Sequence, residues 1–136
     1  MKLGFIGTGK ITSAVINGIC TSKISFQKIL ISQRNRNIAQ KLKKRFRKVN
    51  IAKTNQEVVD KSNWLFLAVT PKVGEKILSK LKYRSNQKII SFISTINLNQ
   101  LKRIIKKRAK IVRAIPLPPI SLGKGPVPIN PNFMMK

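Results

Sequence analysis

Met1–Thr12 has the sequence MKLGFIGTGKIT, and this stretch decides the fold. Its apolar run, Leu3–Ile6, predicts a short buried strand, and the apolar residues at helical spacing after the glycines predict a helix. Gly7-Thr8-Gly9 would then lie between a strand and a helix, whose free N–H groups and positive end suit a pyrophosphate. Tight strand-to-helix turns that bind nothing also need glycine. Thr12 stands where the dinucleotide-binding pattern has its third glycine, so both interpretations stay open here.

Further apolar runs alternate with helical patterns along the chain. Short buried strands are predicted over residues 28–32, 50–52, 64–69, 88–93 and 109–115. The segments between them have apolar residues on one helical face, and Thr54 and Asn97 are predicted to cap two of these helices. Continuous apolar strands separated by helices are typical of a parallel sheet covered on both faces. We therefore predict an α/β fold, a Rossmann-like doubly wound parallel sheet that forms a single domain.

The composition changes after residue 115. Residues 116–136 contain six of the seven prolines, together with Gly123 and Gly125. Proline interrupts helices, so this segment is predicted to be a Pro/Gly-rich extended linker or tail. Residues 1–115 would form the nucleotide-binding domain.

The charge is strongly basic, with 29 Lys and Arg residues against three acids and a formal net charge of +26. Such a balance makes nucleic acid a partner to consider. However, the basic residues are spread along the chain, as a codon bias toward lysine would also produce. Phe46 is the one aromatic residue within the densest basic runs, and its helical spacing assigns it to the core. Nucleic-acid binding is therefore disfavoured as the main function and is kept as an alternative.

The sequence excludes several classes of site. Cys20 is the single cysteine and the chain has no histidine, so a disulfide within the chain, a Ser/His/Asp triad and the usual metal clusters are not expected. We predict no metal and assign no catalytic residue. No apolar run has the roughly 20 residues that span a bilayer, and the glycine turn interrupts any signal-peptide core. The expectation is a cytoplasmic protein without a membrane partner.

The end of the second predicted strand and the residues after it have the sequence Ser32-Gln33-Arg34-Asn35-Arg36. Enzymes that use NAD commonly place an acid here, about 20 residues beyond the glycines, to bind the ribose hydroxyl. This chain has instead a hydroxyl group and guanidinium groups, which bind phosphate through paired N–H donors. The sequence thus favours the 2′-phosphate of NADP, although any position in so basic a chain often holds lysine or arginine.

Several blocks occur in the order found in pyrroline-5-carboxylate reductases, and the chain resembles the N-terminal, NADP-binding half of that family. The blocks are Gly4–Gly9, Lys28–Ser32, Asn55–Val59, Leu65–Pro71, and Val112-Arg113 through Pro116, Pro119 and Gly125. The resemblance extends over nearly the whole chain. The family's helical C-terminal half, which forms the dimer and most of the substrate pocket, has no counterpart among these blocks.

The resemblance implies NADP as the cofactor and assigns contacts to it. The implied cofactor-binding residues are Ile6, Gly7, Thr8, Gly9, Lys10 and Ile11 at the pyrophosphate, Ser32, Gln33 and Arg34 at the 2′-phosphate, Asn55 near the adenosine, and Ala68, Val69, Thr70 and Pro71 toward the nicotinamide, with Ser94 opposite. Structural alternatives stay open: Asn55 could belong to the cap turn, and Ala68 and Val69 to strand packing.

The resemblance also implies hydride transfer from NADPH to 1-pyrroline-5-carboxylate, giving proline. We expect a truncated cofactor domain that binds NADP weakly and turns over little, with the small imine substrate and dimerisation requiring the missing half. Departures from the family pattern leave another NADP-dependent oxidoreductase as an alternative. Thr70 stands where the family usually has lysine, and Leu117 and Pro118 replace an asparagine and a threonine.

Overall fold

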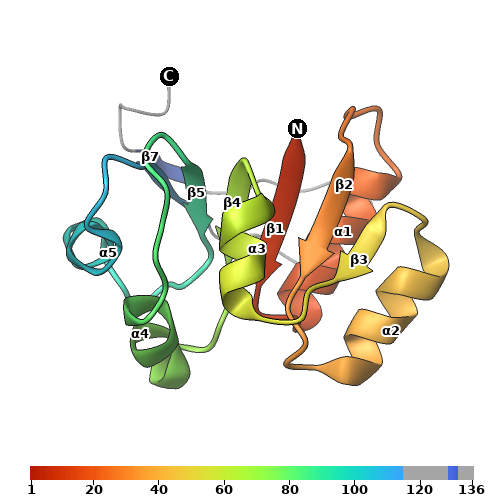
Figure 1. The fold of residues 1–136 in the computed structure, drawn as a ribbon, viewed down its shortest axis with the longest axis horizontal. Coiled ribbons are helices and arrows are strands. Elements are labelled where there is room, and N and C mark those ends of the chain that lie inside the picture. The colour runs from red at the N-terminus through yellow and green to blue at the C-terminus, as the bar shows by residue number, and fades with distance from the viewer. Residues whose placement is uncertain (115–128, 132–136) are drawn as a thin grey trace.

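A computed structural model describes residues 1–114 and 129–131 (Figure 1). The strands are β1 (Lys2–Ile6), β2 (Lys28–Ile31), β3 (Val49–Ile51), β4 (Trp64–Leu67), β5 (Lys88–Ser91), β6 (Lys110–Ala114) and β7 (Ile129–Pro131). The helices are α1 (Lys10–Cys20), α2 (Arg36–Arg45), α3 (Asn55–Lys61), α4 (Pro71–Ser79) and α5 (Leu98–Ile105). Strands and helices alternate from β1 to β6, as the sequence predicts.

The strands form one sheet in the order β3-β2-β1-β4-β5-β6-β7. Strands β1 to β6 are parallel, and β7 pairs antiparallel with β6. The chain adds strands on one side of β1 as far as β3 and then continues on the other side with β4, so the order reverses between β1 and β4. The predicted doubly wound parallel sheet is confirmed, and this reversal is where such sheets bind ligands.

Helices cover both faces of the sheet (Figure 1). On one face, Val15 and Ile16 of α1 and Leu42 of α2 form a core cluster with Phe5 and Phe66 of the sheet. The two phenylalanine rings are stacked, with their centroids 4.4 Å apart. On the other face, a second cluster joins buried residues of α3, α4 and α5 to the sheet. Burial on both faces explains why the strands are continuously apolar.

Two helix starts follow the predicted capping chemistry. Thr54 Oγ1 accepts a hydrogen bond from the Glu57 N–H at 3.1 Å, while the Glu57 carboxylate accepts from the Lys53 N–H at 3.2 Å. Before α5, Asn97 and Gln100 each accept a hydrogen bond from the other's backbone N–H, at 2.8 and 2.9 Å. These bonds satisfy N–H groups that would otherwise lack an intrahelical acceptor.

Some boundaries differ from the prediction. Strands β4 and β5 end two residues earlier than predicted, at Leu67 and Ser91. The apolar runs continue because Val69 and Ile93 are loop residues buried in the core. Residues 129–131, predicted as part of the extended tail, add β7 to the sheet. The rest of that tail lies outside the described residues, and the domain boundary at residue 115 stays a prediction.

Candidate functional site

The first glycine of the turn is required by the fold itself. Gly7 follows β1 with φ +101°, a backbone conformation that favours glycine. A Cβ atom built on Gly7 would lie 2.5 Å from the backbone C and O atoms of Ala68, on the adjacent strand end. No side chain fits in that space, so this glycine needs no ligand to explain it.

The second glycine differs, because the surrounding protein does not require it. Gly9 is the N-cap of α1 with φ −111°, and a Cβ atom there would meet none of the described atoms within 4 Å. No described side chain caps this 11-residue helix, whose first N–H groups have no intrahelical acceptor. The open space at Gly9 therefore borders the positive end of a helix, and the missing side chain leaves room for a phosphate to approach.

Buried hydroxyl groups hold the turn against the end of β2. Ser32 is 2 % exposed and Thr8 is 3 % exposed. Ser32 Oγ accepts a hydrogen bond from the Gly7 N–H at 2.9 Å, and Thr8 Oγ1 donates to the Ser32 carbonyl at 2.6 Å. Thr12 Oγ1 donates to the Gly7 carbonyl at 2.6 Å. The Ser32 hydroxyl thus faces into the turn and bonds to its backbone, and contact of Ser32 with a 2′-phosphate stays a prediction.

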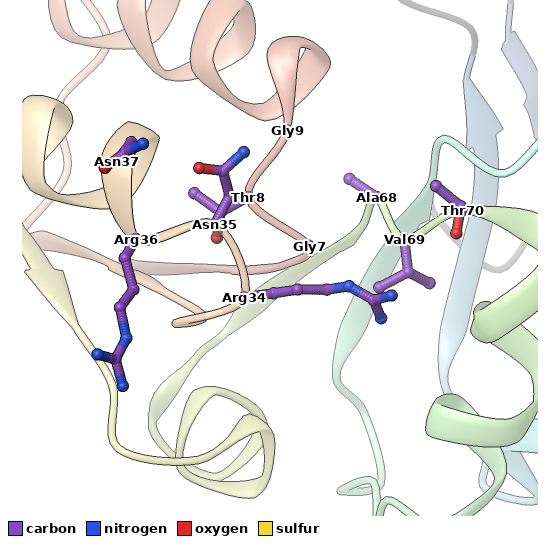
Figure 2. Close-up of a pocket in the computed structure, with 10 residues that line it drawn as sticks. All are labelled: Gly7, Thr8, Gly9, Arg34, Asn35, Arg36, Asn37, Ala68, Val69 and Thr70. Carbon is purple, nitrogen blue, oxygen red and sulfur yellow. The ribbon is translucent and has the colours of Figure 1, made fainter.

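A cleft of about 530 Å³ opens above the reversal of strand order (Figure 2). Its walls are the turn after β1, the loop after β2 and the loop after β4. The lining residues are Gly7, Thr8, Gly9, Arg34, Asn35, Arg36, Asn37, Ala68, Val69 and Thr70. The fold therefore brings three predicted groups together, namely Gly7–Gly9, Arg34 and Ala68–Thr70, at the carboxyl ends of parallel strands.

The two arginines of the cleft have different orientations. The Arg34 side chain extends across the cleft toward Val69, whereas the Arg36 side chain, which also lines the cleft, extends in a different direction (Figure 2). Within the described residues the one ion pair is Lys61–Glu57, at 3.4 Å, so neither guanidinium has a carboxylate partner there. Because an arginine fork binds phosphate oxygens in a bidentate manner, Arg34 is well placed to bind an anionic ligand within the cleft.

The remaining predicted residues are not among those that line the cleft. Ile6 and Ser32 are buried, Asn55 is half-buried at the start of α3, and Lys10, Ile11, Gln33, Pro71 and Ser94 are exposed. Ile11 is an unusually exposed large apolar residue, at 44 %, on the first turn of α1. The Ser94 carbonyl accepts a hydrogen bond from Arg113 Nη2 at 2.7 Å.

The assigned cofactor contacts did not include Asn35, Arg36 and Asn37, which also line the cleft, although the Arg36 guanidinium was part of the predicted phosphate region. They lie where the loop after β2 enters α2, and Asn35 Oδ1 caps that helix by accepting from the Ile38 N–H at 3.2 Å. An asparagine three residues before an apolar helical position is an N-cap pattern. That pattern could have shown that α2 starts at the rim of the cleft.

Cys20 fits a structural role. It is half-buried at the end of α1, packs against the core and lies at the opposite end of the helix from the glycine turn. Burial raises the pKa of its thiol, although Lys48 and Arg45 nearby oppose the rise. Residues 1–114 and 129–131 contain no group of three or more His, Cys, Asp or Glu side chains that could bind a metal. In the same residues, no helix has the length and apolar character needed to cross a membrane.

Known proteins are similar to this chain in sequence and in fold. Pyrroline-5-carboxylate reductase from Escherichia coli (strain K12) is 28 % identical over 137 residues, covering 98 % of this chain and 51 % of that protein. The crystal structure of 1-pyrroline-5-carboxylate reductase from Streptococcus pyogenes matches with a TM-score of 0.82 and 26 % identity, over 97 % of this chain and 49 % of that one. Pyrroline carboxylate reductase from Plasmodium falciparum, solved with NADP bound, also gives a TM-score of 0.82 at 26 % identity. This match covers 97 % of this chain and 48 % of that one.

The chain spans about half the length of the curated relatives it matches. Its similarity to them falls on their N-terminal half, as the resemblance of the sequence blocks implies. Residues 2–97 match the model of a family described as NADP oxidoreductase coenzyme F420-dependent. Because this match covers well over half of the sequence, the chain belongs to that family of NADP oxidoreductases.

Proposed function

We propose that this chain binds NADP and serves as the cofactor half of a pyrroline-5-carboxylate reductase. The observation that carries the proposal is the single cleft that joins the uncapped N-terminus of α1, at Gly9, to the guanidinium of Arg34. The first group suits a pyrophosphate and the second a 2′-phosphate. The NADP bound to the P. falciparum relative supports the same cofactor here.

Each wall of the cleft would bind a different part of NADP. Gly9 and the first N–H groups of α1 bind the pyrophosphate, and Gln33 and Arg34 bind the 2′-phosphate. Ala68 to Thr70 orient the nicotinamide end, and Asn55 lies near the adenosine. NADPH supplies a hydride when it is bound. The protein supplies position and excludes water, and no residue is assigned as a proton donor.

The substrate assignment follows the relatives, with 1-pyrroline-5-carboxylate as acceptor and proline as product. Because those relatives are about twice as long, we propose that the imine site and the dimer contact require residues that this chain does not include. This chain would then bind NADP weakly and turn over little. A cytoplasmic location stays a prediction.

A second candidate is another NADP-dependent oxidoreductase of the same superfamily. Thr70 favours it, because this residue lines the cleft where the resemblance leads us to expect lysine. A panel of imine and carbonyl substrates, assayed with the full-length gene product, would separate the two. A basic nucleic-acid-binding module gains no support from the comparisons.

Titration of the purified chain with NADPH and with NADH tests the cofactor assignment. We expect saturable binding of NADPH, detected by calorimetry, and weaker binding of NADH. Equal affinity for the two nucleotides would contradict the 2′-phosphate site, and no binding of either would contradict the proposed function. An NADPH-oxidation assay with the imine should give little turnover, and efficient turnover would show that this chain is sufficient.

A further inference from the structure

We propose that Thr8 and Ser32 are positioning residues that set the preference for NADP over NAD. Together with Gly7 they form a set of buried hydrogen bonds, called here the hydroxyl clamp. The clamp holds the glycine turn, which carries Gly9, in a fixed relation to the loop that carries Arg34. This inference rests on the proposed function. It gives both residues a role that differs from direct contact with the cofactor.

The hydrogen bonds of the clamp form a consistent set. The Gly7 N–H donates to Ser32 Oγ at 2.9 Å, and the Thr8 hydroxyl donates to the Ser32 carbonyl at 2.6 Å. The two hydroxyl oxygens are 3.0 Å apart. Since the Thr8 proton is already directed at the carbonyl, the Ser32 hydroxyl is the donor in this third contact. Each hydroxyl thus donates once and accepts once, and the arrangement has one pattern of protons.

Burial makes this arrangement rigid. Thr8 is 3 % exposed and Ser32 is 2 % exposed, so a broken bond would leave polar atoms with little access to water. On the glycine turn, Thr12 Oγ1 also binds the Gly7 carbonyl at 2.6 Å. The turn is therefore tied both to the first turn of α1 and to the end of β2.

The position of the clamp links the two proposed phosphate subsites. The backbone ladder between β1 and β2 ends with the Ser32 N–H donating to the Phe5 carbonyl at 3.1 Å. Beyond that bond, the clamp supplies the hydrogen bonds that join the two segments in the described part of the chain. Thr8 directly precedes Gly9, and Ser32 lies two residues before Arg34. A loosened clamp would let the 2′-phosphate ligand move relative to the pyrophosphate site.

Thr8→Val tests the clamp, because valine keeps the shape of threonine and removes the hydroxyl. We expect NADPH affinity to fall about 10-fold and NADH affinity to fall less, because both buried hydrogen bonds of the Thr8 hydroxyl are lost. The ratio of the two affinities should therefore decrease. Thr8→Ser, which keeps the hydroxyl, should restore the ratio. Thr21→Val is the matched control, because the Thr21 hydroxyl bonds to the Asn17 carbonyl at 2.7 Å at the far end of α1.

A measurement on the ligand-free protein tests the hydroxyl clamp independently of the proposed function. In the ligand-free protein, Ser32→Ala should speed hydrogen exchange of the Gly7 amide at least roughly 10-fold, whereas Thr21→Val should leave it unchanged. Unchanged Gly7 exchange would overturn the clamp, whatever the protein binds. Equal loss of NADPH and NADH affinity in Thr8→Val would overturn its role in cofactor preference. If the wild-type chain binds neither nucleotide while Gly7 exchange still depends on Ser32, the proposed function fails and the clamp stands as a structural tie only.

Discussion

The two sides of the cleft differ in how firmly contacts within the chain fix their residues. On the turn side, Gly7 has no room for a side chain, and Thr8 and Ser32 are buried and hydrogen-bonded to each other. On the β4 side, Thr70 occupies the N-cap position of α4, yet its side chain is exposed and makes no capping bond within the described residues. The turn side of the cleft is therefore fixed by contacts within this chain, while the β4 side has an exposed hydroxyl group with no capping bond to the described residues.

This difference separates two requirements of the proposed activity, which are recognition of the nucleotide and positioning of the substrate. A rigid site on the turn side can recognise a nucleotide without help from another segment, since its geometry exists before the ligand arrives. Hydride transfer needs a substrate held close to the cofactor in a defined pose. On the β4 side, Val69 is buried and Thr70 is the exposed polar residue that faces this need. The predictions below test this contrast, from the largest expected effect to the smallest.

Gly7→Ala should have the largest effect, and it should act on stability. The new methyl group would meet the Ala68 backbone at 2.5 Å, and alanine would have to adopt φ +101°. We expect the free energy of unfolding to fall by about 3 kcal/mol or more, because both strain and overlap must be relieved. Urea denaturation measures this change. A loss below about 1 kcal/mol would mean that the turn adjusts easily and is not fixed as described.

Gly9→Ala should separate binding from stability at the same turn. Its methyl group would point into open space, so unfolding should change by less than about 1 kcal/mol. The same methyl group would occupy the space proposed for the pyrophosphate, so NADPH affinity should fall by about 2 kcal/mol, or roughly 30-fold. Calorimetric titration with NADPH measures the loss. Wild-type affinity in this variant would place the pyrophosphate elsewhere.

Sequence reasoning predicted the fold well because its signals are local. Runs such as Leu3–Ile6 and the cap at Asn97 depend on neighbouring residues, and burial on both faces makes the strands continuously apolar. The role of Ser32 was harder to predict, because its partner Thr8 is 24 residues away and meets it only once β1 and β2 pair. Strand β7 has three residues, one of them proline, too few to give a periodic signal.

Arg34→Gln should weaken NADPH binding about 10-fold while changing NADH binding by less than about 2-fold, because glutamine loses the charge that attracts the 2′-phosphate. The Arg34 side chain is exposed and has no carboxylate partner among the described residues, so stability should change little. Arg36→Gln is the matched control, since that side chain points away from Arg34 (Figure 2). If the two variants lose NADPH affinity equally, general positive charge explains the binding and a defined phosphate site does not.

Thr70→Ala should have the smallest effect, and it tests the β4 side directly. Loss of a threonine N-cap usually costs about 1 kcal/mol, but Thr70 makes no capping bond with the described residues, so unfolding should change by less than about 0.5 kcal/mol. NADPH affinity should stay within about 2-fold of wild type, in contrast to Thr8→Val on the opposite side. Thermal denaturation and NADPH titration measure the two quantities. A 10-fold loss of affinity would show that the β4 side recognises the nucleotide as strongly as the turn does, and the contrast between the two sides would then be wrong.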